Sequence, residues 1–150
     1  MNKLIEQSRV LFLDTTAMVR LLQMHPDYYP VVSSVLDYAY EKNTTILTSS
    51  ITLFELAQKA CLAGEGVLAR QYREFFEHSS NVKMCEVNGE VSVKAAELFA
   101  AASRTNHKLT VEDSLRLATA FVNGADCILT ENANFAAATD IPVVLLDEVL

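Results

Sequence analysis

The sequence predicts a three-layer α/β/α fold, in which helices cover both faces of a central, mostly parallel sheet of five strands. Short apolar segments alternate with longer segments of helical periodicity, which is the pattern of βαβ units. The first of these segments, Val10–Leu13, is a continuous apolar run, as is typical of a strand buried on both faces. The chain has 150 residues and no internal repeat or linker, so we expect one domain over residues 1–150.

Five apolar segments are the candidate strands: Val10–Leu13, Thr45–Thr48, Val82–Cys85, Asp126–Thr130 and Val143–Leu146. In an open parallel sheet, ligands bind beyond the carboxyl ends of the strands, where the connections diverge. The polar residues that follow each strand are therefore the candidates for a functional site.

Helices are predicted at the periodic segments between these strands. The first follows Asp14 and ends near His25 and Pro26, and the others cover about 30–41, 51–63, 67–78, 91–104 and 110–122. We expect Gly64 and Gly66 to close the third of these helices, and Asn88–Gly89 to form a turn.

The composition excludes several classes of protein. The first apolar run, Val10–Leu13, is too short for a membrane span or a signal peptide, so we expect a cytoplasmic protein with no membrane contact. Cys61, Cys85 and Cys127 are odd in number and widely spaced, which favours reduced core thiols over disulfides or a zinc site. The three histidines are scattered, so a histidine-ligated metal is not expected.

The charge distribution is acidic. The net charge is −7, and no lysine or arginine follows Arg116. Affinity for nucleic acid grows with the number of phosphates that basic residues neutralise. Any contact with RNA must therefore be local, or depend on bound cations or on a second subunit.

Four polar residues are expected to meet at one edge of the sheet: Asp14, Glu55, Asp113 and Asn132. Each of them lies shortly after a predicted strand or in the first turns of a predicted helix. Two carboxylates about 4 Å apart repel each other by roughly 4 kcal/mol at an effective dielectric constant near 20. A divalent cation would remove this repulsion, and carboxylate oxygens are the ligands that Mg²⁺ prefers.

The same acids also have purely structural interpretations. Asp14 could cap the helix that follows it, and Thr52 with Glu55 and Thr110 with Asp113 both fit the capping-box pattern. Ion pairs within a helix are a further alternative, at the spacings Glu55 to Lys59 and Asp113 to Arg116. Spacing alone leaves these alternatives open.

Four segments resemble successive motifs of one known family: Val10-Leu-Phe-Leu-Asp-Thr-Thr16, Leu47-Thr-Ser-Ser-Ile-Thr-Leu-Phe-Glu55, Asp113-Ser-Leu-Arg-Leu-Ala-Thr-Ala120 and Gly124-Ala-Asp-Cys-Ile-Leu-Thr-Glu-Asn132. In order and spacing they are similar to the PIN domain family, and above all to its compact VapC-like members. The resemblance covers nearly the whole chain. It implies a metal-dependent endoribonuclease, of a group that often acts as the toxin of a toxin–antitoxin pair.

The resemblance also implies roles for individual residues. The family's first three acids fall on Asp14, Glu55 and Asp113, which implies that these bind Mg²⁺ or Mn²⁺. The fourth acid falls on Asn132, whose amide could still orient a water but adds no negative charge, so a second metal should be weakened most. Arg116 stands where many relatives carry histidine, and the resemblance gives it no role. An RNA substrate, an antitoxin partner and a homodimer are implied by the resemblance alone.

Neighbouring residues could support this site. Thr15, Thr16 and Thr130 are candidates for hydrogen bonds to the carboxylates, although each could equally be a helix cap or a strand end. Glu131 could replace the missing fourth acid, but neighbours on an extended segment point in opposite directions.

The acids at the strand ends also allow two other functions. A noncatalytic PIN-fold module that binds RNA or protein would follow if Asn132 has cost the site its metal. A phosphoacceptor receiver domain is also a small α/β protein with acids at strand ends. That pattern needs a lysine after a late strand and an aspartate after the third, whereas here no lysine follows Lys108 and the third strand runs into Cys85-Glu86.

Overall fold

The computed structural model of the protein describes residues 1–150 and contains a five-stranded sheet in the order β3-β2-β1-β4-β5. The strands are β1 (Val10–Leu13), β2 (Thr45–Ser49), β3 (Val82–Cys85), β4 (Cys127–Thr130) and β5 (Val143–Leu145). All neighbouring strands are parallel. The predicted α/β class is confirmed, and the sheet is entirely rather than mostly parallel.

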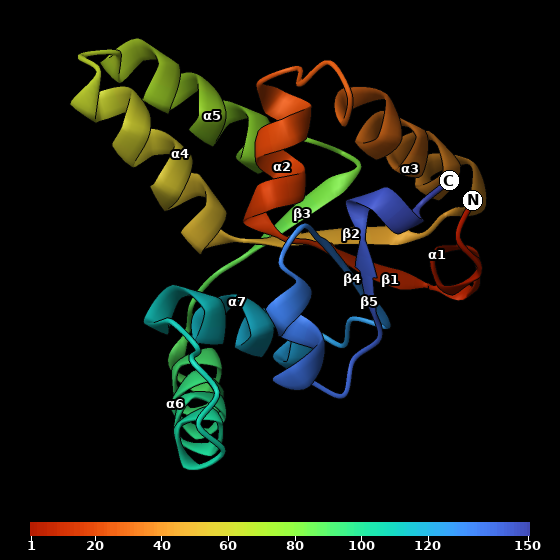
Figure 1. The fold of residues 1–150 in the computed structure, drawn as a ribbon. Coiled ribbons are helices and arrows are strands. Elements are labelled where there is room, and N and C mark those ends of the chain that lie inside the picture. The colour runs from red at the N-terminus through yellow and green to blue at the C-terminus, as the bar shows by residue number, and fades with distance from the viewer.

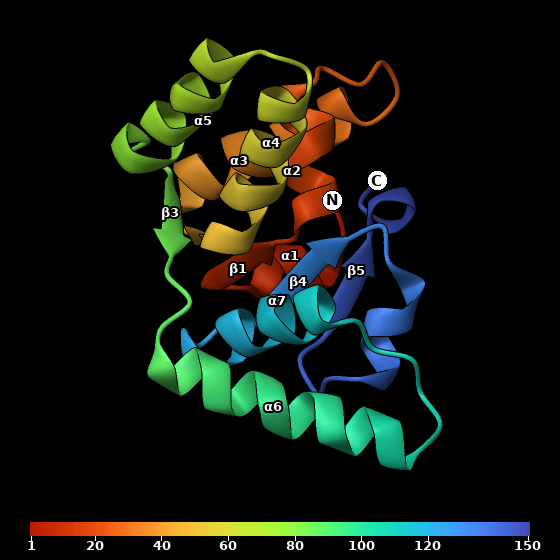
Figure 2. The same cartoon turned by 90° about the vertical axis from the view of Figure 1, so that its left-hand side faces the viewer.

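Helices cover both faces of this sheet, as Figures 1 and 2 show. The helices are α1 (Lys3–Gln7), α2 (Thr15–Leu22), α3 (Tyr29–Lys42), α4 (Ser50–Leu62), α5 (Gly66–His78), α6 (Gly89–Arg104) and α7 (Val111–Val122), with 3₁₀ turns at Ala133–Ala137 and Leu146–Glu148. Helices α2 to α5 lie on one face, and α6 and α7 lie on the other (Figure 2).

The alternation of side chains along the strands explains how the two layers pack. In β1, Leu11 and Leu13 join a large apolar cluster with residues of α2 to α5, whereas Phe12 points to the other face and packs with Leu117 of α7. Neighbouring residues of a strand point to opposite faces of a sheet. A strand with both faces covered must be apolar at every position, which is the pattern that predicted these strands.

The order of the strands creates a switch point between β1 and β4. The chain moves outward from β1 to β2 and β3, and then crosses back to form β4 on the other side of β1. The connections that leave the carboxyl ends of β1 and β4 therefore diverge to opposite faces, which is where ligands bind in open α/β sheets. Asp14 follows β1 at this point, and Asn132 follows β4 by two residues.

Several local predictions were wrong. Gly66 begins α5 rather than closing α4, and Gly89 is the first residue of α6, with Asn88 as its N-cap. Short helix α1 was not predicted, because five residues are too few to show a helical period. Cys61 is exposed rather than in the core.

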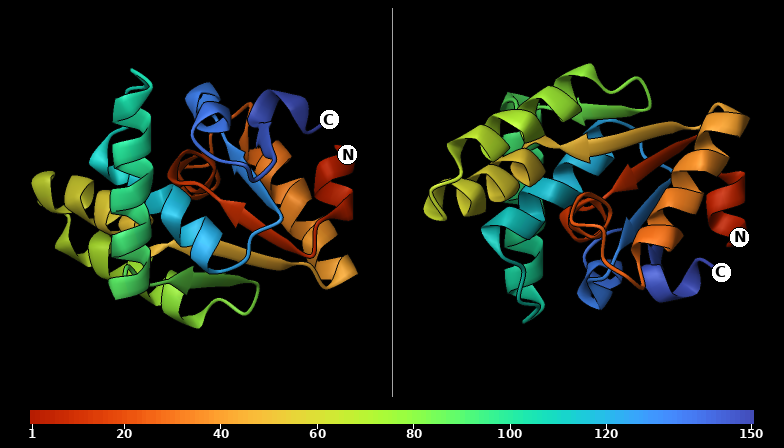
Figure 3. Two further views of the ribbon diagram at one scale, coloured as in Figure 1. Left: turned by 90° about the horizontal axis from the view of Figure 1, so that it is seen from below. Right: turned by 90° about the horizontal axis from the view of Figure 1, so that it is seen from above.

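The two ends of the chain lie side by side, as both views in Figure 3 show. The backbone N–H of Asn2 donates to the carbonyl of Val149 at 2.7 Å, and the Asn2 side chain donates to the carbonyl of Glu148 at 3.0 Å. These contacts hold the two ends of the chain together. None of the helices has the length and apolar character needed to cross a bilayer.

Candidate active site

Asp14 lies at the carboxyl end of β1, immediately before α2, and is almost completely buried, with 2% of its surface exposed. Its Oδ2 accepts a hydrogen bond from the Thr130 hydroxyl at 2.7 Å, and its Oδ1 has no hydrogen-bond partner. Although Asp14 occupies the N-cap position of α2, its side chain makes no capping bond. Burial raises the pKa of this carboxyl above its ordinary value, against the lowering effect of the Thr130 hydrogen bond.

Glu55 lies one turn into α4, the helix that follows β2. The N-cap of α4 is Ser49, whose hydroxyl accepts from the N–H of Ile51, so the alternative of a capping box between Thr52 and Glu55 does not hold. Thr52 is instead a buried residue within the helix. The Glu55 carboxylate pairs with Arg116, not with Lys59, and thus points away from the helix surface toward the sheet edge.

Asp113 lies in the first turn of α7. The Thr110 hydroxyl caps this helix by accepting from the N–H of Asp113 at 3.0 Å, as the sequence predicted. The Asp113 carboxylate accepts from Arg116 Nη1 at 2.6 Å. Burial raises the pKa of this carboxyl, against the lowering effect of hydrogen bonds from Thr110.

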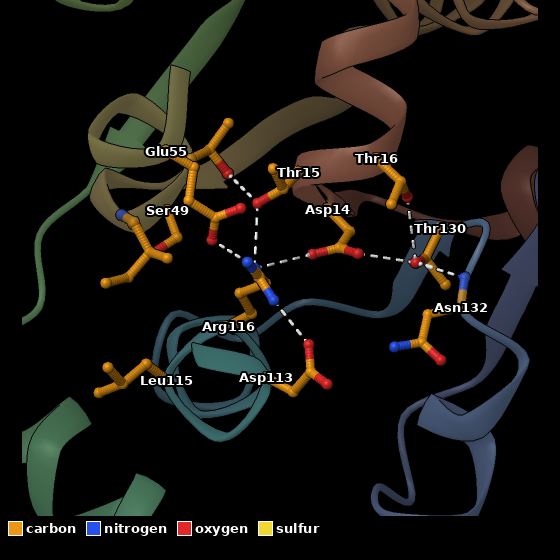
Figure 4. Close-up of polar contacts among 12 residues, drawn as sticks. Asp14, Thr15, Thr16, Ser49, Glu55, Asp113, Leu115, Arg116, Thr130 and Asn132 are labelled. Atoms are coloured by element: carbon orange, nitrogen blue, oxygen red, sulfur yellow. Dashed lines mark hydrogen bonds and ion pairs between the residues drawn. The ribbon is translucent and has the colours of Figure 1, made fainter. Parts of the chain in front are cut away.

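Arg116 stands at the centre of these three acids, as Figure 4 shows. Its guanidinium donates from Nη1 to Asp113 and from Nη2 to Glu55, and its Nε donates to the Thr15 hydroxyl at 3.0 Å. The same Nε lies 3.7 Å from the unpartnered Oδ1 of Asp14. Only 11% of the Arg116 side chain is exposed, and burial lowers its pKa. The structure thus gives a central place to a residue for which the sequence had suggested no role.

Asn132 has a different position. Its Oδ1 accepts from the N–H of Asn134 at 3.0 Å and so caps the 3₁₀ turn that follows β4. Its Nδ2 makes no hydrogen bond, and Figure 4 shows this nitrogen on the side of the residue that faces Asp14 and Asp113. The neighbouring Glu131 pairs with Arg20 at 3.0 Å, and this ion pair turns it away from the three acids. Asn132 therefore faces the site as a donor rather than as an acid.

A layer of buried hydroxyl groups supports the acids. The Thr15 and Thr52 hydroxyls lie 2.9 Å apart, and the hydroxyls of Thr16 and Thr130 lie 3.4 Å apart. Thr16 also accepts from the backbone N–H of Glu131 at 2.9 Å, which ties α2 to the end of β4. The sequence had suggested Thr15, Thr16 and Thr130. It had offered Thr52 only as a possible helix cap, and its contact with Thr15 depends on the packing of α2 against α4.

The chemistry of this site fits a divalent cation. Its charged donors are hard carboxylate oxygens, and the buried, unpartnered Oδ1 of Asp14 leaves a lone pair without the hydrogen bond that buried polar atoms normally have. No three acidic, histidine or cysteine side chains form a ready-made metal centre, however. The guanidinium of Arg116 stands among the acids, so they surround a cation that belongs to the chain itself.

The chain is similar in sequence and in fold to known proteins. The sequence matches the PIN domain family over residues 11–141. Among solved structures, VapBC2 from Rickettsia felis, bound to a DNA fragment from its promoter, aligns with a TM-score of 0.73 and 20% identity over 91% of this chain and 98% of that chain. A toxin–antitoxin complex from Klebsiella pneumoniae aligns with a TM-score of 0.61 and 19% identity over 91% and 97%.

A third similar structure is VapC20 from Mycobacterium tuberculosis, described as a toxin that cleaves the sarcin–ricin loop. It aligns with a TM-score of 0.64 and 15% identity over 85% of this chain and 94% of that chain. At these identities the likeness concerns the fold alone. No curated protein matches the sequence. Because the family match spans most of the chain and the fold agrees with it, this chain belongs to the PIN domain family.

Proposed function

We propose that this protein is an endoribonuclease that uses Mg²⁺ or Mn²⁺, with Asp14, Glu55 and Asp113 as the metal-binding acids and Asn132 as a fourth site residue. The observation that carries the proposal is the Asp14 carboxylate, which is buried, keeps one oxygen unpartnered and lies beside two further acids at the switch point of the sheet. A charge placed there has a folding cost, and this favours a functional rather than a structural role.

The three acids would hold the metal, and the surrounding residues would orient them. Thr130 binds Oδ2 of Asp14, which leaves Oδ1 directed toward the other acids. When bound, the metal supplies a water of lowered pKa and a positive charge for the phosphate. The free Nδ2 of Asn132 is a hydrogen-bond donor suited to a phosphate oxygen. No protein nucleophile is required, and none of the cysteines contacts this site.

The same proposal extends to partners. The Klebsiella pneumoniae structure is described as a toxin–antitoxin complex, and VapC20 as a toxin that cleaves the sarcin–ricin loop. We infer by analogy that this protein acts in the cytoplasm as a toxin that cleaves RNA, that an antitoxin protein inhibits it and that it forms a homodimer. With a net charge of −7, the chain needs bound cations or a partner to bring RNA to the site.

Cleavage of RNA tests the proposal. The purified protein should cleave a structured RNA in the presence of Mg²⁺, and Asp14→Asn should lower the rate at least about 100-fold by removing a metal ligand. Asp126→Asn is the matched control, because Asp126 lies at the opposite end of β4 and contacts only backbone N–H groups. Equal cleavage by the Asp14 variant and the wild type would show that the assignment is wrong.

One observation favours the noncatalytic alternative. The guanidinium of Arg116 already neutralises part of the acidic cluster, so a stable fold does not require a metal. A module that binds RNA or protein without catalysis predicts no calorimetric signal for Mn²⁺ beyond that of a variant with Asp14, Glu55 and Asp113 replaced by alanine. The nuclease proposal predicts binding that this triple variant lacks.

A further inference from the structure

Arg116 is unusual for its surroundings. Its side chain is 11% exposed and contacts three carboxylates. They lie at the start of α2, in α4 and in α7. A buried charge is tolerated when it is paired and hydrogen bonded, and the planar guanidinium can bond several acceptors at once. Arg116 is therefore a fixed positive centre of the site and not a surface residue that happens to lie near it.

The charges of the site limit what else can bind there. Three carboxylates carry three negative charges, and Arg116 offsets one of them. One divalent cation offsets the two that remain, whereas a second would leave an excess of positive charge in a region where water screens little. Asn132, which stands where a fourth acid would have added negative charge, supplies none.

The hydrogen bonds of the three acids leave carboxylate oxygens available to one ion beside the guanidinium. Asp14 Oδ1 has no hydrogen-bond partner, while Glu55 and Asp113 each bind Arg116 through a single oxygen. Asp14 Oδ1 is thus free of hydrogen bonds, and Glu55 and Asp113 each keep one oxygen that does not bind Arg116. The terminal nitrogens of Arg116 also keep N–H groups beyond those used for Glu55 and Asp113.

We propose that Arg116 takes the place of a second metal ion, so that the site binds one divalent cation and the guanidinium supplies the second positive charge for the RNA phosphate. This inference rests on the proposed metal-dependent function and specifies its stoichiometry. In two-metal sites, the two ions stabilise the attacking and the leaving oxygens of the phosphate. Here an arginine, which forms strong hydrogen bonds with phosphate oxygens, provides one of the two.

Calorimetric titration with Mn²⁺ tests this inference. The wild type should bind one ion. Arg116→Gln, which removes a positive charge next to the ion, should bind it at least about tenfold more tightly. In the double variant Arg116→Gln with Asn132→Asp, the acidic charge is high enough for two ions to bind. Arg116→Lys keeps the charge and should bind one ion, like the wild type.

Arg20→Gln is the matched control for the loss of an arginine, because Arg20 also pairs with a glutamate but does not contact the three acids. It should leave both the stoichiometry and the affinity unchanged. Circular dichroism checks that each variant is folded, and the wild-type stoichiometry remains decisive if Arg116→Gln does not fold.

Three results would overturn the inference: two ions bound by the wild type, unchanged affinity in Arg116→Gln, or loss of binding in that variant. In each of these cases metal binding by the wild type leaves the proposed nuclease function standing. Absence of Mn²⁺ binding in every variant would instead refute both proposals together.

Discussion

Two aspartates at opposite edges of the same sheet show how differently one residue type can be used. Asp126 precedes β4, is exposed, and its Oδ2 accepts from the backbone N–H groups of Arg9 at 2.9 Å and Val10 at 3.0 Å. Asp14 follows β1, is buried, and leaves one oxygen without a partner. The first carboxylate joins two strands, while the second retains binding capacity that the fold does not use. A buried carboxylate oxygen without a hydrogen bond therefore distinguishes a candidate functional acid from a structural one.

The largest effect on stability is expected at the structural aspartate. Asp126→Ala removes the acceptor for two backbone N–H groups and loosens the start of β1 from that of β4. We expect the free energy of unfolding to fall by about 1–3 kcal/mol, the usual worth of hydrogen bonds to a charged group. Urea denaturation measures this change. A variant as stable as the wild type would mean that water replaces these bonds fully.

A smaller change of opposite sign is expected at the functional aspartate. Asp14→Asn removes a buried charge and should raise the free energy of unfolding without metal by up to about 1 kcal/mol. Since burial raises the folded-state pKa of Asp14 above 3.8, the folded protein binds this proton more tightly than the unfolded chain does. The wild type should therefore lose stability as the pH rises above about 3.8 through the raised pKa.

The pH dependence of this difference is the sharper measurement. The advantage of Asp14→Asn should be absent at low pH, where Asp14 is protonated in both states. It should grow as the pH rises above about 3.8, because the unfolded chain then ionises while the folded carboxyl keeps its proton, and it should level off above the raised pKa of the fold. Thermal unfolding of the two proteins across this pH range measures the difference. A difference that is the same at every pH would show that the charge of Asp14 has no folding cost, and the contrast with Asp126 would disappear.

The sequence predicted the scaffold and the approximate location of the site for a clear physical reason. Strands buried on both faces are continuous apolar runs, and the first run ends at Asp14 with no ambiguity. Parallel strands place their carboxyl ends at one edge, so acids that follow different strands meet there. The strand order and the position of α6 and α7 on the second face depend on long-range packing that no local pattern encodes.

The role of Arg116 could not be predicted from spacing. Its distance of three residues from Asp113 indicated a weak pair within one helix, and that pair is present. The contact with Glu55 exists only because α4 and α7 pack near each other at the sheet edge. Likewise, the sequence allowed Asp14 to be a helix cap, and only its surroundings in the fold show that its side chain is not used in that way.

The most direct test of the account is a crystal structure of the protein soaked with Mn²⁺, examined for anomalous scattering. We expect one strong peak in contact with Asp14 Oδ1, with carboxylate oxygens of Glu55 or Asp113 completing the protein ligands and Arg116 still beside them. A fully soaked crystal with no peak at these acids, or with its only peak elsewhere on the surface, would contradict it.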